Sequence, residues 1–419
     1  MSDSDKNIDC GSSSSRSTQK TQPSPSTMSV LRTPEACFDN LPLWNYEPQY
    51  FTSTLYGLKV RIAYYDLGEE EAEETILLTH GMSSWSYLYR RMISPLVRAG
   101  HRIILFDQVG CGRSDKPSCE QDYTYERHIG WNIDLLINHL RLKGVTVVLQ
   151  DWGGLIGTRV VAAHPGAFRR LVIANTMLPT CDDSFFKVSP GFYSWKTFAF
   201  RTGLKDDIWM EERGGRWPGQ IMAQKAVGPS NPEMDLMERA AYDAPYPDDI
   251  YKAGARMFPE LVPTPSTDPT SRPMMAEAEN NAAAWGVLQK FPKPVLLAFS
   301  DEDTVMAGGD AIWLEHCPGT KHPGVEHVTI NGVGHFLQDG GAEQLLEAIV
   351  DLISATPSAS IEPLCAGPVG GEAAIAAKAA AEAAATERAV AHGDVGISTP
   401  SDGGVSFIAP TPEGRTAYQ

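Results

Sequence analysis

The amino-acid sequence predicts an α/β fold with a mostly parallel sheet, helices on both faces and a helical insertion. Six short apolar runs are bounded by turn residues, as buried strands are: 75–79, 102–106, 145–149, 170–174, 295–299 and 327–330. Segments of helical character separate many of them: 85–99, 125–142, 155–164 and 342–353. Alternation of strands and helices favours a parallel sheet, because each parallel neighbour requires a crossover connection.

The insertion lies between the strand that ends at residue 174 and the strand that begins at residue 295. This stretch is too long for a loop in a compact domain, and it is rich in aromatic residues, Pro and Met. We therefore expect a helical cap over residues 177–292, above the carboxyl edge of the sheet, where open α/β folds bind ligands. The core would comprise residues 34–176 and 293–355.

The two ends of the chain have a different composition from the core. Residues 1–33 are rich in polar residues without apolar periodicity, which predicts a disordered N-terminal tail. Residues 356–419 form a low-complexity C-terminal tail, in which the Ala-rich stretch 372–391 favours a helix.

Composition narrows the class of partner. The net charge of −17 over 419 residues disfavours binding to nucleic acid or to an anionic membrane. The seven cysteines are scattered without CxxC spacing, which favours reduced thiols over a disulfide framework. The sequence also has no clustered metal-ligand spacing. The chain also lacks the apolar segment of a signal peptide and any run long enough for a membrane helix. We expect a cytoplasmic, monomeric protein without metal or cofactor.

Asp151 stands at a sharp turn between the strand 145–149 and the next helix, and Gly153 and Gly154 let the backbone turn tightly there. Many hydrolases place a serine at such a turn. A serine that attacks a saturated carbon would leave an ether, whereas a carboxylate leaves an ester that water can cleave. An aspartate here therefore predicts alkyl halides or epoxides as substrates.

A histidine and a second acid should complete this site. His335 follows the last strand in a glycine-flanked loop, and the acidic run 301–303 follows the strand 295–299. The order nucleophile, acid, histidine is that of the α/β-hydrolases. The backbone N–H groups of Met82 and Trp152 would form the oxyanion hole.

Several segments resemble haloalkane dehalogenases of the α/β-hydrolase superfamily, in the subfamily with an aspartate acid and two halide-binding tryptophans. The resemblance extends over residues 34–354 and includes the cap. The segments that carry it are 80–81, 85–92, 112–117, 122–124, 150–154, 191–196, 241–248, 251–254 and 258–259. It implies an α/β-hydrolase fold with an eight-stranded, mostly parallel sheet.

The resemblance also implies roles for individual residues. Asp151 would be the nucleophile, His335 the base that activates water, and Asp303, ahead of Asp301, the acid that orients His335. Trp152 and Trp195 would donate indole N–H groups to the leaving halide, because an indole is a donor without a competing acceptor. The substrate pocket would be lined by Leu155, Phe192, Phe258, Pro259 and Val305. The expected reaction converts a 1-haloalkane and water into a primary alcohol and a halide ion through an alkyl-aspartyl ester.

Two departures from the family pattern follow His80 and Gly81. Met82 replaces a polar residue, and Ser83 stands where the family often has proline. Because the backbone N–H of Met82 would be the working group, these changes affect the expected efficiency more than the mechanism.

The main alternative is an epoxide hydrolase, which shares the triad and needs cap tyrosines to protonate the opening oxygen. The cap offers Tyr193, Tyr242, Tyr246 and Tyr251, but Trp195 favours a dehalogenase. A fluoroacetate dehalogenase would need an arginine pair after Asp151, which is absent. A protein that only binds ligands would be expected to have lost a member of the triad.

Overall fold

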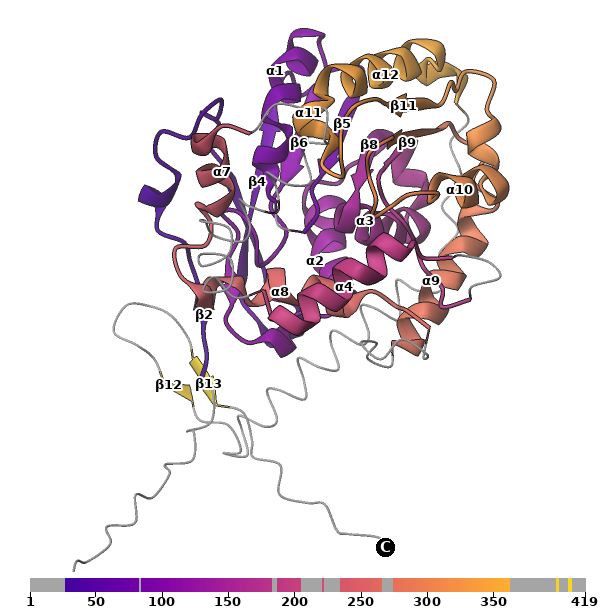
Figure 1. The fold of residues 1–419 in the computed structure, drawn as a ribbon. Helices are drawn as coiled ribbons and strands as arrows, with labels where there is room; N and C mark the ends of the chain where they lie inside the picture. Colours follow the sequence, from indigo (N-terminus) through magenta and orange to yellow (C-terminus); the bar gives the residue numbers. More distant parts are fainter. Residues whose placement is uncertain are drawn as a thin grey trace, which may run out of the picture.

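An eight-stranded sheet forms the centre of the computed structural model, which describes residues 27–82, 84–182, 187–204, 221, 234–265, 274–361, 397–398 and 406–408 (Figure 1). The strand order is β11-β10-β9-β8-β5-β6-β4-β3. The strands are β3 Gln49–Ser53, β4 Val60–Leu67, β5 Thr75–Thr79, β6 Arg102–Phe106, β8 Val145–Gln150, β9 Phe168–Ala174, β10 Val295–Ser300 and β11 Val328–Ile330.

The sheet is parallel from β6 to β11, and only β3 and β4 run antiparallel to their neighbours. The parallel strands are apolar on both faces because helices cover both sides; every residue of β8, for example, is buried. The edge strand β3 has one exposed side, which explains why its sequence lacks a continuous apolar run. The predicted fold class is confirmed.

Helices cover the two faces of the sheet. On one face α1 packs against α12, and on the other face α3 packs against both α2 and α9. The helices are α1 Arg90–Arg98, α2 Tyr125–Ile133, α3 Asp151–Ala163, α4 Pro190–Thr202, α7 Leu236–Asp243, α8 Ala253–Leu261, α9 Met275–Leu288, α10 Asp310–His316, α11 Leu337–Gly340 and α12 Ala342–Ala355.

Three of the predicted helices differ from the structure in their form. The predicted helix 85–99 begins as a 3-10 helix over Ser86–Tyr89 and is α-helical over Arg90–Arg98. The predicted helix 125–142 is α-helical only to Ile133 and continues as a π-helix over Asp134–His139. The predicted helix 155–164 begins earlier, because β8 passes directly into α3 at Asp151. The first residue of this helix is therefore the predicted nucleophile.

The insertion between β9 and β10 is helical in its described parts and contains α4, α7, α8 and α9. Helix α4 lies over the carboxyl edge of the sheet, where the Ser189 hydroxyl before it donates to the Val305 carbonyl. Helix α9 instead packs against α3, where Arg159 contacts Glu277 at 3.1 Å. The exact limits of cap and core remain predictions.

A buried ionic cluster joins the insertion to the core. The Arg90 guanidinium of α1 donates to the Asp339 carboxylate of α11 and, at 2.9 Å, to the Tyr242 hydroxyl of α7. Tyr242 in turn donates to Asp339 at 2.5 Å, and Glu238 of α7 lies 3.2 Å from Arg90. Three helices that are distant in the sequence therefore meet at one buried charge.

Residues 29–33, which the sequence places in the N-terminal tail, are ordered in the structure. Strand β2 (Val30–Leu31) pairs with β7 (Lys116–Pro117), and Arg32 binds both carboxylate oxygens of Asp115 at 2.8 and 2.9 Å. Thr33 donates to the Pro245 carbonyl in the cap at 2.6 Å. We call residues 29–33 the N-terminal strap. Its order comes from partners far along the chain, which a local composition cannot reveal.

Three short strands, β1 Thr27–Met28, β12 Ile397–Ser398 and β13 Ser406–Ile408, form a separate antiparallel sheet from the two ends of the chain. The predicted Ala-rich helix at 372–391 lies outside the described residues, as does Ser83. Within the described residues, the helices are too short or too polar to cross a membrane.

Candidate active site

Asp151 occupies the junction where the buried strand β8 becomes helix α3. Its backbone has a φ of +48°, a left-handed conformation that costs free energy in a residue other than glycine. The Asp151 N–H donates to the Asn175 carbonyl at 3.1 Å, and the Thr176 hydroxyl donates to the Asp151 carbonyl at 2.7 Å. These contacts fix the turn and present the carboxylate at the carboxyl edge of the sheet.

The glycines near Asp151 allow neighbouring segments of the chain to pack closely around it. A Cβ atom on Gly154 would lie 2.0 Å from the Thr176 hydroxyl oxygen, so α3 can begin next to the end of β9 only with glycine there. A Cβ atom on Gly81 would lie 2.1 Å from Oδ1 of Asp151. The left-handed residue at the turn is thus Asp151 itself, and the glycines make room around it.

The two carboxylate oxygens of Asp151 have different partners. The backbone N–H of Met82 donates to Oδ1 at 2.6 Å, while Oδ2 lies 3.3 Å from Nε2 of His335. Met82 therefore stands where the sequence predicts an oxyanion-hole donor. The second predicted donor, the Trp152 N–H, is the next backbone group along α3, and its role remains a prediction.

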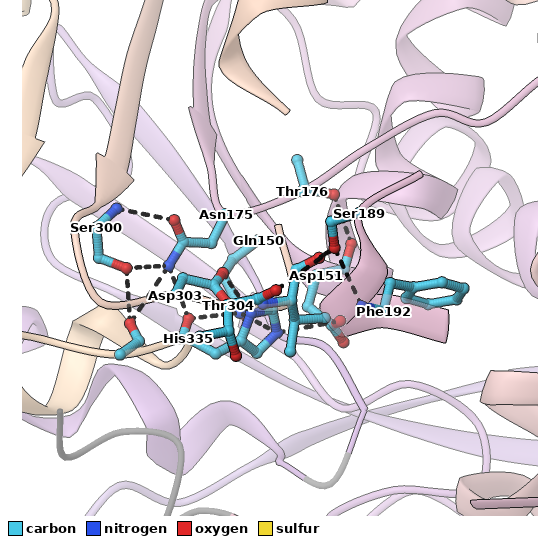
Figure 2. A network of polar contacts seen from close by, with 12 residues as sticks. Gln150, Asp151, Asn175, Thr176, Ser189, Phe192, Ser300, Asp303, Thr304 and His335 are labelled. Atoms are coloured by element: carbon cyan, nitrogen blue, oxygen red, sulfur yellow. Dashed lines mark hydrogen bonds and ion pairs between the residues drawn. The ribbon is translucent and has the colours of Figure 1, made fainter. Parts of the chain in front are cut away.

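His335 lies between two carboxylates. Its Nδ1 is 2.8 Å from Oδ2 of Asp303, whose other oxygen accepts the Val305 N–H at 2.7 Å. Asp301 points elsewhere and accepts the Gly332 N–H at 2.8 Å. The structure thus brings Asp151, His335 and Asp303 together and leaves Asp301 outside the group (Figure 2).

The buried carboxylates set the protonation of this group. Burial alone lowers the pKa of His335, but Asp303 and Asp151 outweigh burial and raise that pKa to about 10. Burial would raise the pKa of Asp303, but the charge and hydrogen bond of His335, with the N–H groups of Val305 and Met306, hold that pKa below its usual range. The two carboxylates therefore favour the protonated form of His335 in the resting site.

A cavity opens above Asp151 and His335 and is mostly apolar. Both predicted halide-binding residues, Trp152 and Trp195, line it. The described lining residues are Met82, Asp151, Trp152, Phe192, Trp195, Ile221, Pro259, Val305, Met306, His335 and Phe336. Three of the five predicted pocket residues, Phe192, Pro259 and Val305, are therefore in place.

The other two predicted pocket residues, Leu155 and Phe258, lie behind the cavity wall. The Phe258 ring packs against Trp152 with 5.0 Å between ring centroids, and the Leu155 carbonyl accepts the Tyr125 hydroxyl at 2.6 Å. Tyr125 meets the Trp152 ring edge-on at 5.1 Å. Phe258 and Tyr125 thus hold the Trp152 ring and do not line the cavity. Met306, Phe336 and Ile221 line the cavity without having been predicted.

Two buried carboxamides near the triad were also not predicted. Asn175 donates to the His335 carbonyl at 3.0 Å, and Gln150 donates to the same carbonyl at 3.3 Å. Gln150 ends β8 and Asn175 follows β9, at the same edge of the sheet as Asp151, and this position is the signal that could have identified them.

The carboxylate at a strand-to-helix turn, the histidine and acid from later strands and the helical insertion define an α/β hydrolase. A family model described as alpha/beta hydrolase fold matches residues 74–202. The chain is 42% identical over 331 residues to a haloalkane dehalogenase of Psychrobacter cryohalolentis, covering 79% of this chain and 100% of that protein. It is 38% identical to a haloalkane dehalogenase of Mycolicibacterium paratuberculosis, covering 77% of this chain and 98% of that protein. The chain belongs to the haloalkane dehalogenase family.

Solved structures agree with this assignment. The tetrameric haloalkane dehalogenase DpaA from Paraglaciecola agarilytica is 30% identical and superposes with a TM-score of 0.62, covering 77% of this chain and 98% of that chain.

Proposed function

We propose that the protein hydrolyses 1-haloalkanes to primary alcohols and halide ions through a covalent ester on Asp151. The observation that carries this proposal is the unequal environment of the Asp151 carboxylate. Oδ1 is held by the Met82 N–H at 2.6 Å, while Oδ2 faces His335 at the floor of a cavity that two tryptophans line.

In the first step, Oδ2 of Asp151 attacks the carbon that carries the halogen. The new C–O bond forms as the carbon–halogen bond breaks, and the halide leaves with the bonding electron pair. Indole N–H groups of Trp152 and Trp195 would bind the departing anion, which is weakly hydrated and suits donors in an apolar cavity.

In the second step, water attacks Cγ of the ester. His335 takes a proton from this water through Nε2 while Asp303 holds Nδ1, and the Met82 N–H stabilises the negative charge that develops on Oδ1. His335 returns this proton to the alkyl oxygen as the bond between Cγ and that oxygen breaks, and the alcohol leaves. The cycle returns the Asp151 carboxylate and releases one proton for each halide ion.

The cavity lining indicates the substrate class. Among the described residues that line the cavity, Asp151 and His335 are the ones with ionisable side chains, and the rest are apolar or aromatic. The carboxylate of a haloacid would lie beside the Asp151 carboxylate, and the described lining offers it no arginine or lysine. Uncharged haloalkanes therefore fit the site best.

The cap tyrosines give little support to an epoxide hydrolase. The described lining of the cavity includes none of Tyr193, Tyr242, Tyr246 and Tyr251. Tyr242 instead donates to Asp339 in the buried ionic cluster. A tyrosine that protonates an epoxide oxygen would have to face the nucleophile.

The test is a halide-release assay on short 1-bromo- and 1-chloroalkanes, with terminal epoxides of the same chain length as the competing substrates. Halide release at a rate matched by proton release would support the proposal. Turnover of the epoxides without halide release from the haloalkanes would overturn it. A monomeric, cytoplasmic protein remains our expectation, although the relative DpaA is described as tetrameric; light scattering would settle the oligomeric state.

A further inference from the structure

We infer that Asn175 is a positioning residue that sets the imidazole of His335 for hydrolysis of the ester, and that it contributes little to formation of that ester. This inference rests on the proposed function. Asn175 lies directly after β9, and β9 lies between β8, which precedes Asp151, and β10, which precedes Asp303. It is the point where the loops of the three triad residues meet (Figure 2).

The side chain of Asn175 is fully buried and uses both ends of its carboxamide. Oδ1 accepts the Ser300 N–H at 3.0 Å, at the start of the loop to Asp303. Nδ2 donates to the Ser300 hydroxyl oxygen at 2.6 Å and to the His335 carbonyl at 3.0 Å. The Ser300 hydroxyl also donates to the Gly334 carbonyl at 2.7 Å. One carboxamide thereby ties the acid loop to the histidine loop.

The main chain of Asn175 has a separate role. Its carbonyl accepts the Asp151 N–H at 3.1 Å, and its φ of +40° is a conformation that asparagine tolerates better than most residues. Replacement by glycine would keep this backbone conformation and the bond to Asp151. The same replacement would remove the side-chain bonds to Ser300 and His335. The two functions of Asn175 can therefore be separated by one substitution.

The two chemical steps make different demands on these contacts. Ester formation needs Asp151, which α3 and the Met82 N–H hold independently of the Asn175 side chain. Ester hydrolysis needs His335 Nε2 at a defined position relative to Cγ of Asp151. Loss of the Asn175 donor leaves, among the described side chains, the longer bond from Gln150, at 3.3 Å, to hold the His335 carbonyl oxygen.

The experiment measures the two steps separately in Asn175→Gly. A rapid-quench measurement of halide release gives the rate of ester formation, and the intact mass of the protein gives the fraction of alkyl-enzyme at steady state. We expect the rate of ester formation to change by less than about threefold. The rate of ester hydrolysis should fall by about 10- to 100-fold, because a displacement of a reacting group by about 1 Å has an effect of this size. Alkyl-enzyme should then accumulate in the variant.

Asn281→Ala is the matched control. Asn281 is also fully buried and its side chain also joins two segments, donating to the Pro179 carbonyl at 2.8 Å, but it lies on α9 and does not line the cavity. This variant should lose stability without accumulating alkyl-enzyme. If Asn175→Gly does not fold, Ser300→Ala provides a second comparison, because it removes the hydroxyl that joins Asn175 to the Gly334 carbonyl and leaves the Asn175 backbone unchanged.

An equal fall in both steps, or an unchanged partition between them, would overturn the role of Asn175. That result differs from failure of the proposed function, which would appear as absence of halide release and of alkyl-enzyme in the unmodified protein.

Discussion

His335 Nε2 lies 3.3 Å from Oδ2 of Asp151, so the base of the second step contacts the nucleophile of the first. Ester formation removes the charge of Asp151 and with it the hydrogen bond and the attraction that help to raise the pKa of His335 to about 10. The pKa of His335 should therefore fall when the ester forms, and the imidazole should then lose its proton and become a base.

The first prediction concerns this change. The rate of ester hydrolysis should increase with pH through a midpoint well below 10, because the alkyl-enzyme lacks the Asp151 charge that raises the pKa of His335 in the free enzyme. Single-turnover decay of alkyl-enzyme, followed by intact mass from about pH 5 to pH 10, measures it. A midpoint equal to that of His335 in the free protein, titrated by NMR, would contradict the prediction.

The second prediction is that His335→Gln traps the ester. Without an imidazole, no group at this position takes the proton from water, while Asp151 keeps its Met82 N–H and can still attack the substrate. Incubation with 1-bromobutane should raise the intact mass by one butyl group, on the peptide that contains Asp151. An Asp151→Asn variant is the control and should keep its original mass.

The third prediction tests the cap tryptophan. Trp195→Phe should weaken halide binding by roughly 10- to 100-fold, because a hydrogen bond to a charged group is worth about 1.5–3 kcal/mol. Quenching of the remaining tryptophan fluorescence by bromide or iodide measures the affinity. Trp285→Phe is the matched control, since the Trp285 indole donates to the Leu178 carbonyl at 2.8 Å, outside the cavity. Equal halide affinities in the two variants would show that Trp195 does not bind the halide.

The fourth prediction concerns Gly81. Gly81→Ala places a methyl group 2.1 Å from Oδ1 of Asp151, so the carboxylate or the Met82 turn must move. We expect halide release to fall by about 100-fold or more, as for a misplaced reacting group. The control is Gly286→Ala in α9, where a Cβ atom has open space. That change should leave activity intact and raise stability by roughly 0.5–1 kcal/mol.

The fifth prediction concerns the buried ionic cluster. Asp339→Ala removes a carboxylate from the fully buried Arg90 side chain, and Glu238, at 3.2 Å, compensates only in part. The free energy of unfolding should fall by about 3–5 kcal/mol, as when one partner of a buried pair is removed. Glu35→Ala, at an exposed carboxylate that pairs with Arg61 and Arg113, should cost about 1 kcal/mol or less. Urea unfolding of both variants makes the comparison, and similar losses would argue against a special role for the cluster.

Sequence reasoning located features that depend on local patterns. Buried parallel strands are continuous apolar runs, and Asp151 and Asp303 each follow one of them. His335 follows the short parallel edge strand β11, so the meeting of the three residues at one edge could be predicted. The antiparallel strands β3 and β4 were both missed: more than half of β3 is exposed, and Arg61 and Asp66 interrupt the apolar run of β4. Which side chains face the cavity depends on how helices pack: Met306 lines the cavity, whereas Phe258 supports Trp152 from behind.

The N-terminal strap has a practical consequence for anyone who shortens this protein. A version that starts at residue 34, where composition alone would place the first core residue, discards the Arg32 pair with Asp115 and the Thr33 bond to Pro245. It would remove the Arg32 partner of the Asp115 carboxylate. It would also remove the hydrogen bond that joins the N-terminal strap to the cap. Trimming should therefore stop before Ser29, and a library that varies cap mobility could begin with Thr33, a residue far in sequence from every group that reacts.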